Sequence, residues 1–335
     1  MALRLTGTLS FDPPVLLAPM AGITDLPFRR LVARFGAGLV VSEMVAGDEV
    51  LRARPEARAR AELGLDQAAT AVQLAGRDPA LLALAAQLVA DMGARIIDIN
   101  MGCPAKRVTA QGGHGACGSA LMREPDHALR LIEAVVAAVD VPVTVKMRLG
   151  WDHDSLNAPD LARRAAGAGA VMVTVHGRTR CQFYTGRADW AAIAPTVRAA
   201  GVPVVANGDI VDAASARAAL AASGAAGVMV GRGAQGAPWR LARIAADLGL
   251  GPAPVVPQGA ALADLVVEHH EAMLSFYGRD LGLRVARKHL GWYLDAAGLT
   301  AARPAVVTAA TPAATQAALR AAFADQPDQP DRRAA

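Results

Sequence analysis

The feature that most constrains the fold is a regular alternation of two kinds of segment between about residues 15 and 250. Short apolar runs rich in β-branched residues, typical of strands buried on both faces, alternate with helix-favouring stretches rich in Ala, Leu and Arg. We predict strands over residues 15–18, 39–42, 71–74, 95–100, 143–147, 171–175, 204–206 and 227–230. The helices predicted between them include 79–91, 125–139, 158–166, 212–222 and 238–248. Eight such units in series favour an α/β fold of the (β/α)8 TIM-barrel type over an open sheet.

The Gly/Pro-rich stretch at residues 249–254 predicts a domain boundary. We expect a barrel domain over residues 1–250, opening with a short hairpin over 1–14 that closes one end of the barrel. A small all-helical domain is expected over 251–324, with helices at 261–277, 281–294 and 312–323. The last residues, 325–335, are rich in Pro, Asp and Arg and predict a disordered tail.

Composition narrows the class of protein. A hydrophobic content of 53% with 19% charged residues is typical of a globular chain with a large core. No apolar run approaches the roughly 18 residues of a membrane span, and the first residues lack the apolar core of a secretory signal. Three cysteines without a CxxC pair indicate a reduced, cytoplasmic setting. The net charge of +4 permits an anionic partner, and we expect a monomer.

Polar residues follow the predicted strands, at the end where (β/α)8 barrels place their active sites. Loop polarity alone is common, but thiol, amide, lysine and imidazole groups at one rim predict a functional site. The residues at or just after the strand ends are Pro19, Met20, Ala21, Ser42, Glu43, Gln73, Asn100, Cys103, Lys146, Arg148, His176, Arg178, Asn207, Gly208, Asp209, Gly231 and Arg232.

Two glycine-containing turns follow the last two strands, where such barrels often hold a phosphate. Glycine lets backbone N–H groups approach an anion, and Arg232 adds positive charge. Tight turns that need glycine are the alternative explanation. A lysine at this end of a barrel can stabilise negative charge on a bound ring such as a flavin, and a buried ion pair is the alternative explanation of Lys146. Gln73 offers a donor and an acceptor to a heterocycle.

Cys103 lies in a Gly-Cys-Pro turn directly after a predicted strand. A thiol in an ordinary environment has a pKa of about 8.5 and is mostly protonated at neutral pH. This favours a proton donor over a nucleophile. Lys106 and Arg107 beside it favour the thiolate, so both roles stay open here.

No metal site is predicted. The stretch 152–154 and the pair His269 and His270 lack a converging set of ligands, and we interpret them as surface residues.

The helix predicted over 281–294 carries basic residues three and four positions apart. A solvated charged face is the usual explanation of such a run, but their clustering favours contacts with phosphates. They are Arg284, Arg287 and Lys288, with His289, Trp292 and Tyr293 close by.

From about Leu16 to Tyr293 the chain resembles the tRNA-dihydrouridine synthases, the Dus family, and most closely its bacterial B subgroup. The combination of motifs is more specific than any one of them. They are Ala18-Pro19-Met20-Ala21-Gly22-Ile23-Thr24-Asp25, Val72-Gln73-Leu74, Asn100-Met101-Gly102-Cys103-Pro104-Ala105-Lys106, Val145-Lys146-Met147-Arg148, His176-Gly177-Arg178-Thr179, Asn207-Gly208-Asp209-Ile210, Gly231-Arg232-Gly233 and Ala286-Arg287-Lys288-His289.

The resemblance implies an FMN-dependent oxidoreductase that saturates the C5–C6 bond of a uridine in the tRNA D-loop. It implies that NADPH reduces FMN, that the flavin N5 delivers hydride to C6, and that Cys103 delivers a proton to C5. It also implies that the target base leaves its stack and that the helical domain binds tRNA through Arg284, Arg287 and Lys288. Asn100 and Arg178 are assigned to the target uridine. The flavin positions are Pro19, Met20, Ala21, Gln73, Lys146, His176, Asn207, Gly208, Asp209, Gly231 and Arg232.

One loop departs from the family pattern. The glycine-rich stretch 109–117 after Cys103 is a few residues longer than expected, which predicts a mobile lid and leaves Cys117 as a second thiol candidate.

Two alternatives remain open. One is an FMN barrel oxidoreductase that acts on a free pyrimidine, like dihydroorotate dehydrogenase. The other is a non-catalytic tRNA-binding protein, which would not need a thiol, a lysine and an imidazole at one rim.

Overall fold

The computed structural model describes residues 2–7, 9–51, 70–110 and 116–324. The chain forms two compact units, one of residues up to 233 together with 240–253, and one of residues 234–239 together with those from 254 onwards. The predicted tail over 325–335 and the centre of the predicted lid, residues 111–115, lie outside the described residues.

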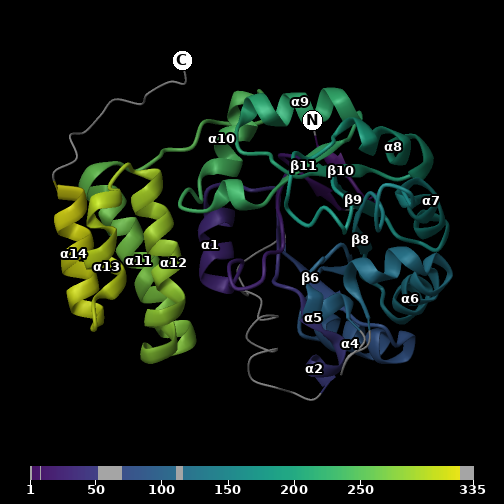
Figure 1. Ribbon diagram of the computed structural model, residues 1–335, viewed down its shortest axis with the longest axis horizontal. Coiled ribbons are helices and arrows are strands. Elements are labelled where there is room, and N and C mark those ends of the chain that lie inside the picture. The colour runs from purple at the N-terminus through teal and green to yellow at the C-terminus, as the bar shows by residue number, and fades with distance from the viewer. Residues whose placement is uncertain (1, 8, 52–69, 111–115, 325–335) are drawn as a thin grey trace. The chain divides into compact units, whose positions relative to one another are not determined.

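The first unit is a closed barrel of parallel strands (Figure 1). Each strand pairs with its neighbour, and the pairing of β4 with β6 completes the ring. A two-residue strand, β5 (Val45–Ala46), adds to β6. The predicted TIM barrel is confirmed, with every predicted strand present and its ends within one residue of those observed. The barrel strands are β3 (Val15–Leu17), β4 (Leu39–Val41), β6 (Thr70–Ala75), β7 (Ile96–Met101), β8 (Val143–Arg148), β9 (Met172–His176), β10 (Val204–Asn207) and β11 (Gly227–Val230).

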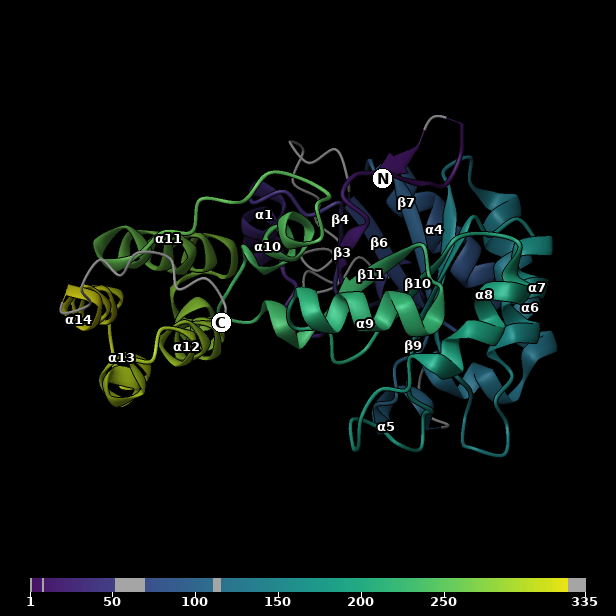
Figure 2. The ribbon, with the colours of Figure 1, turned by 90° about the horizontal axis from the view of Figure 1, so that it is seen from above.

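Helices cover the outside of this barrel (Figure 2). Their starts follow local chemistry: the Asp78 carboxylate accepts the Leu81 N–H at 3.0 Å at the start of α4, and Asp212 forms a capping box with Ser215 at α9. The helices are α1 (Leu26–Arg34), α2 (Gly47–Leu51), α4 (Pro79–Asp91), α5 (Lys106–Thr109), α6 (Pro125–Ala138), α7 (Ala158–Gly167), α8 (Ala194–Ala200), α9 (Ala213–Ser223) and α10 (Arg240–Asp247), with short 3-10 turns η1 (Gly118–Arg123), η2 (Ala191–Ile193) and η3 (Arg232–Ala234).

An antiparallel pair, β1 (Leu3–Arg4) and β2 (Ser10–Phe11), forms the predicted hairpin at the start of the chain. Leu3 and Phe11 pack into one buried cluster with Leu16, Ala71 and other residues near the beginnings of the barrel strands. Because side chains alternate along a strand, the positions two and four residues further on face the same interior. The amino-terminal end of the barrel interior is therefore apolar, and polar residues begin at its carboxyl end.

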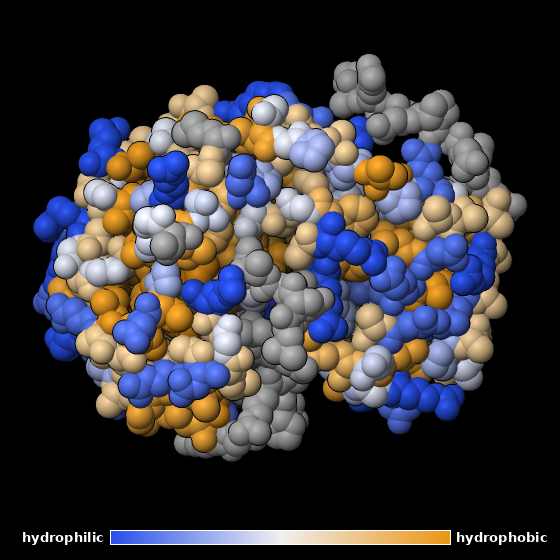
Figure 3. Space-filling model, turned by 180° about the vertical axis from the view of Figure 1, so that it is seen from behind, coloured by the Kyte–Doolittle hydropathy of each residue, from blue (hydrophilic) through white to orange (hydrophobic). Residues whose placement is uncertain are grey.

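The second unit consists of helices, as predicted. They are α11 (Gly259–Tyr277), α12 (Arg279–Ala296), the 3-10 turn η4 (Thr300–Ala302), α13 (Arg303–Thr308) and α14 (Pro312–Ala324). On the face drawn in Figure 3, this unit carries many hydrophilic residues. In the part of the chain that the structure describes, none of the helices has the length and hydropathy needed to cross a membrane.

The prediction that His269 and His270 are surface residues is wrong, because both imidazoles are buried. They lie on a helix that packs against α12, and the Nδ1 atom of His269 lies 3.1 Å from the hydroxyl of Tyr293. Adjacent histidines look like a polar surface in the sequence, and only the packing of two helices shows that they face inward.

Candidate active site

The polar side chains of the site form rows across neighbouring strands. Gln73 on β6 pairs with Asp98 on β7, which pairs with Thr144 on β8. Two residues further along, Asn100 pairs with Lys146. Paired residues of adjacent parallel strands point to the same side of the sheet, so these side chains share the barrel interior.

Gln73 lies between two of these partners. Its Nε2 donates to Asp98 Oδ2 at 2.6 Å, and its Oε1 accepts from Asn100 Nδ2 at 2.7 Å. The other carboxylate oxygen of Asp98 accepts from the Thr144 hydroxyl at 2.6 Å. The predicted flavin residue Gln73 and the predicted substrate residue Asn100 are thus joined in one buried network.

The backbone around Cys103 is held from three directions. The Oδ1 atom of Asn100 accepts the N–H groups of Gly102 at 3.1 Å and of Cys103 at 2.9 Å. Arg148 Nε donates to the Gly102 carbonyl at 2.8 Å, and Ser119 donates to the Cys103 carbonyl through its N–H at 3.0 Å and its hydroxyl at 2.8 Å. These hydrogen bonds fix the backbone of Cys103 just past β7, and its thiol is half-buried.

The other two cysteines differ from Cys103 in their surroundings. Cys117 is buried, and burial together with neighbouring Cys103 and Asp48 raises the pKa of its thiol to about 11. Cys181 is exposed. Of the two thiols that the sequence analysis proposed, Cys103 is the more accessible.

Lys146 extends from β8 to a partner on β10. Its Nζ donates to Asn207 Oδ1 at 3.1 Å, and Asn207 Nδ2 in turn donates to the Met229 carbonyl at 2.8 Å. Burial, and after it the charge of Arg148, lowers the pKa of Lys146 to about 8, while Asp98 and Cys103 act in the opposite direction. The ammonium is therefore present at neutral pH, although its hydrogen-bond partner is a neutral amide.

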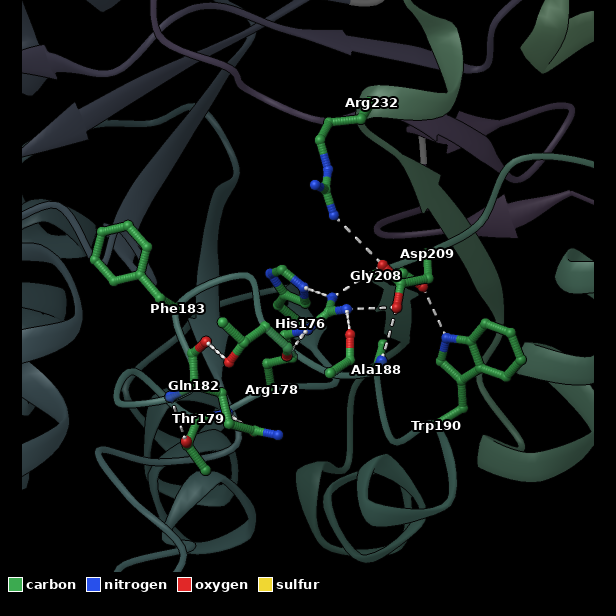
Figure 4. A network of polar contacts seen from close by, with 12 residues as sticks. His176, Arg178, Thr179, Gln182, Phe183, Ala188, Trp190, Gly208, Asp209 and Arg232 are labelled. Carbon is green, nitrogen blue, oxygen red and sulfur yellow. Dashed lines mark hydrogen bonds and ion pairs between the residues drawn. The ribbon is translucent and has the colours of Figure 1, made fainter.

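His176 ends β9 and faces several cations (Figure 4). Burial, followed by the charges of Lys146, Arg148, Arg178 and Arg232, lowers its pKa well below the ordinary value. The ring is neutral at pH 7, and its Nε2 lies 3.2 Å from Arg178 Nη1, which can only donate. The ring proton is therefore on Nδ1, which leaves that atom as a hydrogen-bond donor.

Arg178, which the sequence analysis assigns to the target uridine, is fully buried, and its guanidinium forms hydrogen bonds with other groups of the protein (Figure 4). It forms a double hydrogen bond with Asp209, at 3.0 and 2.5 Å, and donates to the Thr185 and Gly186 carbonyls at 3.1 and 2.7 Å. Burial alone would raise the pKa of Asp209, but hydrogen bonds from Arg178 and from the Ala188 N–H lower it overall. This contact joins the loops after β9 and β10.

The predicted glycine-rich turns differ in their constraints. Gly208 has a φ of +115°, and a Cβ there would lie 2.8 Å from Cδ2 of His176, so no larger residue fits. A Cβ at Gly231 would make ordinary contacts of 3.7 Å with the sulfur of Met20 and 3.8 Å with Ala18. Arg232 is exposed, with its Nη2 atom 3.5 Å from Asp209. Pro19 and Met20 are half-buried, and Ala21 is exposed.

Sequence reasoning missed Asp98 and Thr144. Both had been treated as part of uniformly buried strands. Their signal is the alternation along β7 and β8, where polar residues recur at every second position: Asp98 and Asn100, then Thr144, Lys146 and Arg148. An aromatic pair in the loop after β9, Phe183 and Tyr184, was also missed; both are exposed, and Arg148 and Arg232 lie over the Tyr184 ring at 5.5 and 5.4 Å.

A family model described as dihydrouridine synthase (Dus) matches residues 16–326. The chain belongs to the dihydrouridine synthase family. It is 66% identical over 320 residues to a "Probable tRNA-dihydrouridine synthase" of Rhodobacter capsulatus, covering 95% of this chain and 97% of that protein. A Rhizobium leguminosarum protein of the same description is 54% identical, covering 84% and 85%. The "tRNA-dihydrouridine synthase B" of Xanthomonas campestris is 47% identical, covering 86% and 85%, so the predicted family and B subgroup are confirmed.

The Dus family is flavin-dependent, and the residues present fit a flavin. Among the described residues Lys146 Nζ has one hydrogen-bond acceptor, so an ammonium with three N–H groups retains donors for a bound ring. Thr174 on β9 pairs with Lys146 on β8. Its hydroxyl is buried and has no hydrogen-bond partner in the described structure. A heterocycle with several polar atoms would satisfy both groups.

The second unit of this Dus protein carries the predicted basic stripe. Arg284 and Arg287 are exposed on α12, and Lys288 is half-buried. His289 and Tyr293, expected close to the stripe, are buried instead, with His289 stacked edge-to-face on His269 at 5.1 Å. Within the described ranges, His, Cys, Asp and Glu side chains form no group that could hold a metal ion.

Proposed function

We propose that this protein is an FMN-dependent tRNA-dihydrouridine synthase that reduces the C5–C6 bond of a D-loop uridine. The observation that carries the proposal is the Cys103 loop of a Dus barrel, held by Asn100, Arg148 and Ser119 at the carboxyl end of β7. The register of β7 and β8 pairs Asn100 with Lys146, so the loop and the ammonium belong to the same end of the barrel.

We assign the flavin ring to the interior of the barrel mouth. Gln73, Lys146, His176 and Asn207 offer donors and acceptors there. Lys146 would stabilise negative charge on the ring. The phosphate is assigned to the turns after β10 and β11, with Gly208, Asp209, Gly231 and Arg232, and the turn after β3 supplies Pro19, Met20 and Ala21. A flavin held there would supply the hydride for C6 of uracil, with NADPH as the source of its electrons.

Cys103 supplies the proton in this proposal. Its Sγ–H gives a proton to C5 as C6 gains the hydride, and the thiolate that results recovers a proton from water. Asn100 holds the backbone of this loop, and Arg178 shapes the loop after β9 through Asp209. A uridine inside a folded tRNA must leave its stack to reach these groups.

We assign residues 1–250 to catalysis and residues 251–324 to tRNA binding. Arg284, Arg287 and Lys288 supply contacts to phosphates, which dominate affinity for a folded RNA. We also propose that the enzyme works as a monomer in the cytoplasm, on tRNA and with NADPH as the reductant.

Nucleoside mass analysis of an unmodified tRNA tests the proposal. The transcript is incubated with the purified protein, FMN and NADPH, and a gain of two hydrogens on uridine is expected. The Cys103→Ala variant should keep bound flavin and its visible spectrum but lose product. Reduction of free uracil or orotate, with none of tRNA, would instead assign the barrel to a small pyrimidine.

A further inference from the structure

We propose that Asp98 is a positioning residue: its carboxylate sets the direction of a chain of amides, Gln73 and then Asn100, that holds the backbone of Cys103. Only the description of Cys103 as the proton donor rests on the proposed function. The arrangement of the chain stands on its own contacts.

Asp98 lies inside the barrel with 4% of its surface exposed. Burial raises the pKa of Asp98, while the hydrogen bonds from Thr144 and Gln73 and the charge of Lys146 favour its ionised form. In that form the carboxylate accepts hydrogen bonds and cannot donate. One oxygen accepts from the Thr144 hydroxyl and the other from Gln73 Nε2, both at 2.6 Å. The amide nitrogen of Gln73 must therefore face Asp98, and its oxygen must face away.

The same constraint passes to the next residue. The oxygen of Gln73 faces Asn100 and accepts from its Nδ2 at 2.7 Å. This orients the Asn100 amide so that Oδ1 faces the N–H groups of Gly102 and Cys103, at 3.1 and 2.9 Å. The carboxylate of Asp98 thus sets the orientation of the Gln73 amide and, through it, the orientation of the Asn100 amide.

An amide at position 98 would remove this direction. The Asp98→Asn side chain is almost the same size, but it can donate to the oxygen of Gln73 as well as accept from its nitrogen. Both orientations of the chain then become possible. In the reversed one Asn100 presents its NH2 to the N–H of Cys103, and two donors face each other.

A charge exchange separates this role from general support of the fold. In Asn100→Asp alone, the carboxylate of Asp98 keeps the Gln73 oxygen facing position 100, so two acceptors repel each other there. That repulsion displaces the side chain at position 100 from the N–H groups of Gly102 and Cys103. In the double variant Asp98→Asn, Asn100→Asp, the chain runs in reverse. Gln73 donates to the carboxylate introduced at position 100, which still accepts the N–H groups of Gly102 and Cys103.

Hydrogen–deuterium exchange of the Gly102 and Cys103 amides, resolved by fragmentation, measures the contact directly. It is read on the flavin-loaded protein without RNA or reductant. Each single variant should exchange at these amides about tenfold faster than wild type, the factor expected for the removal of one hydrogen bond of ordinary net strength. The double variant should return to within about threefold of wild type.

Thr144→Val is the matched control. It removes one donor to Asp98 without altering the direction of the chain, so it should lower the melting temperature and leave exchange at Gly102 and Cys103 unchanged. Wild-type exchange in Asp98→Asn, or a double variant no better protected than the single variants, would overturn the proposal. If a single variant does not fold, the double variant decides: an unfolded or unprotected double variant also overturns it.

Activity gives a second readout. With tRNA, Asp98→Asn should lower kcat and leave the KM for tRNA unchanged, because the residue acts through the Cys103 backbone. An absence of tRNA reduction by the wild type would refute the proposed function, while the exchange results would still decide the role of Asp98.

Discussion

The positive charge of Lys146 is only weakly stabilised by the groups around it in the protein. Its ammonium donates to the neutral oxygen of Asn207, and burial lowers its pKa to about 8. Such a group costs folding free energy, and a bound anionic partner offsets that cost. The placement is expected of a residue retained for binding rather than for stability.

Lys146→Met should change how stability depends on pH. Between pH 8 and 10.5 the unfolded chain holds more protons at this lysine than the folded protein, so the free energy of unfolding of the flavin-free wild type rises with pH there. Below pH 8 the cost is fully present. In the variant, the free energy of unfolding should no longer rise over this pH range, and at pH 7 it should exceed that of the wild type by at most about 3 kcal/mol. Urea titrations at pH 7, 9 and 10.5 measure this, and an unchanged rise would assign it to another group.

At the scale of elements, Arg148 ties the end of one strand to two loops. Its side chain is buried, and besides the Gly102 carbonyl it donates to the carbonyls of Thr179 and Phe183, both at 2.8 Å. Burial lowers its pKa to about 10, so it stays charged at neutral pH. The Cys103 loop and the loop after β9 are therefore coupled through one guanidinium.

Arg148→Met should leave three carbonyls without their donor and destabilise the barrel by about 3 kcal/mol. Arg148→Lys should be intermediate, because an ammonium cannot span all three acceptors. Urea denaturation provides the values. Arg164→Met, which breaks the solvent-exposed ion pairs with Asp126 and Asp160 on the outside of the barrel, is the control and should have a much smaller effect on stability. Equal losses at both positions would contradict the coupling.

The helix α11 contains a buried histidine whose ring makes no polar contact within the described part of the chain. His270 is fully buried, and neither ring nitrogen has a partner among the described residues. Burial lowers its pKa, with Glu271 acting weakly in the other direction. Below about pH 6.5 the unfolded chain binds a proton here more readily than the folded chain, so stability falls as the pH falls.

His270→Leu should reduce this acid sensitivity. The variant is expected to be about 1 kcal/mol more stable than the wild type at pH 5, with a smaller difference at pH 7.5, since an apolar side chain replaces an unpaired polar one. Helical circular dichroism during urea titration at the two pH values tests it. A variant as acid-sensitive as the wild type would show that other groups dominate.

At the scale of the whole molecule, a net charge of +4 is modest for a protein proposed to bind tRNA. Local clusters must then supply the attraction. The exposed Arg284 and Arg287 with Lys288 on α12 form such a cluster.

Replacing Arg284, Arg287 and Lys288 together by Ala should raise the KM for tRNA and flatten its dependence on salt. Every cation that no longer neutralises a phosphate should reduce the salt slope by about one unit. Initial rates measured at low and at moderate salt, at several tRNA concentrations, give both quantities. Arg320→Ala, which removes a cation paired with Asp264 elsewhere in the helical unit, is the control. A triple variant with the wild-type slope would place the RNA contacts on other residues.

Much of this organisation is visible in the sequence. The barrel follows from local patterns, because apolar runs, capping residues and glycines act on near neighbours in the chain. The rim residues follow as well, since strand ends in a barrel meet at one edge. Gln73, Asn100, Cys103 and Lys146 were found in this way, and they do lie at that end.

What the sequence by itself determined is the order of strands and helices, the family, and the set of chemical groups at the barrel mouth. Only the tertiary structure decided which of those groups touch. Strand register brings Asp98 into contact with Gln73 and Thr144, which lie 25 and 46 positions away in the sequence. Arg178 binds Asp209, and the side chain of His270 is buried. Contacts of this kind depend on how strands align and helices pack, and local patterns carry no record of that alignment.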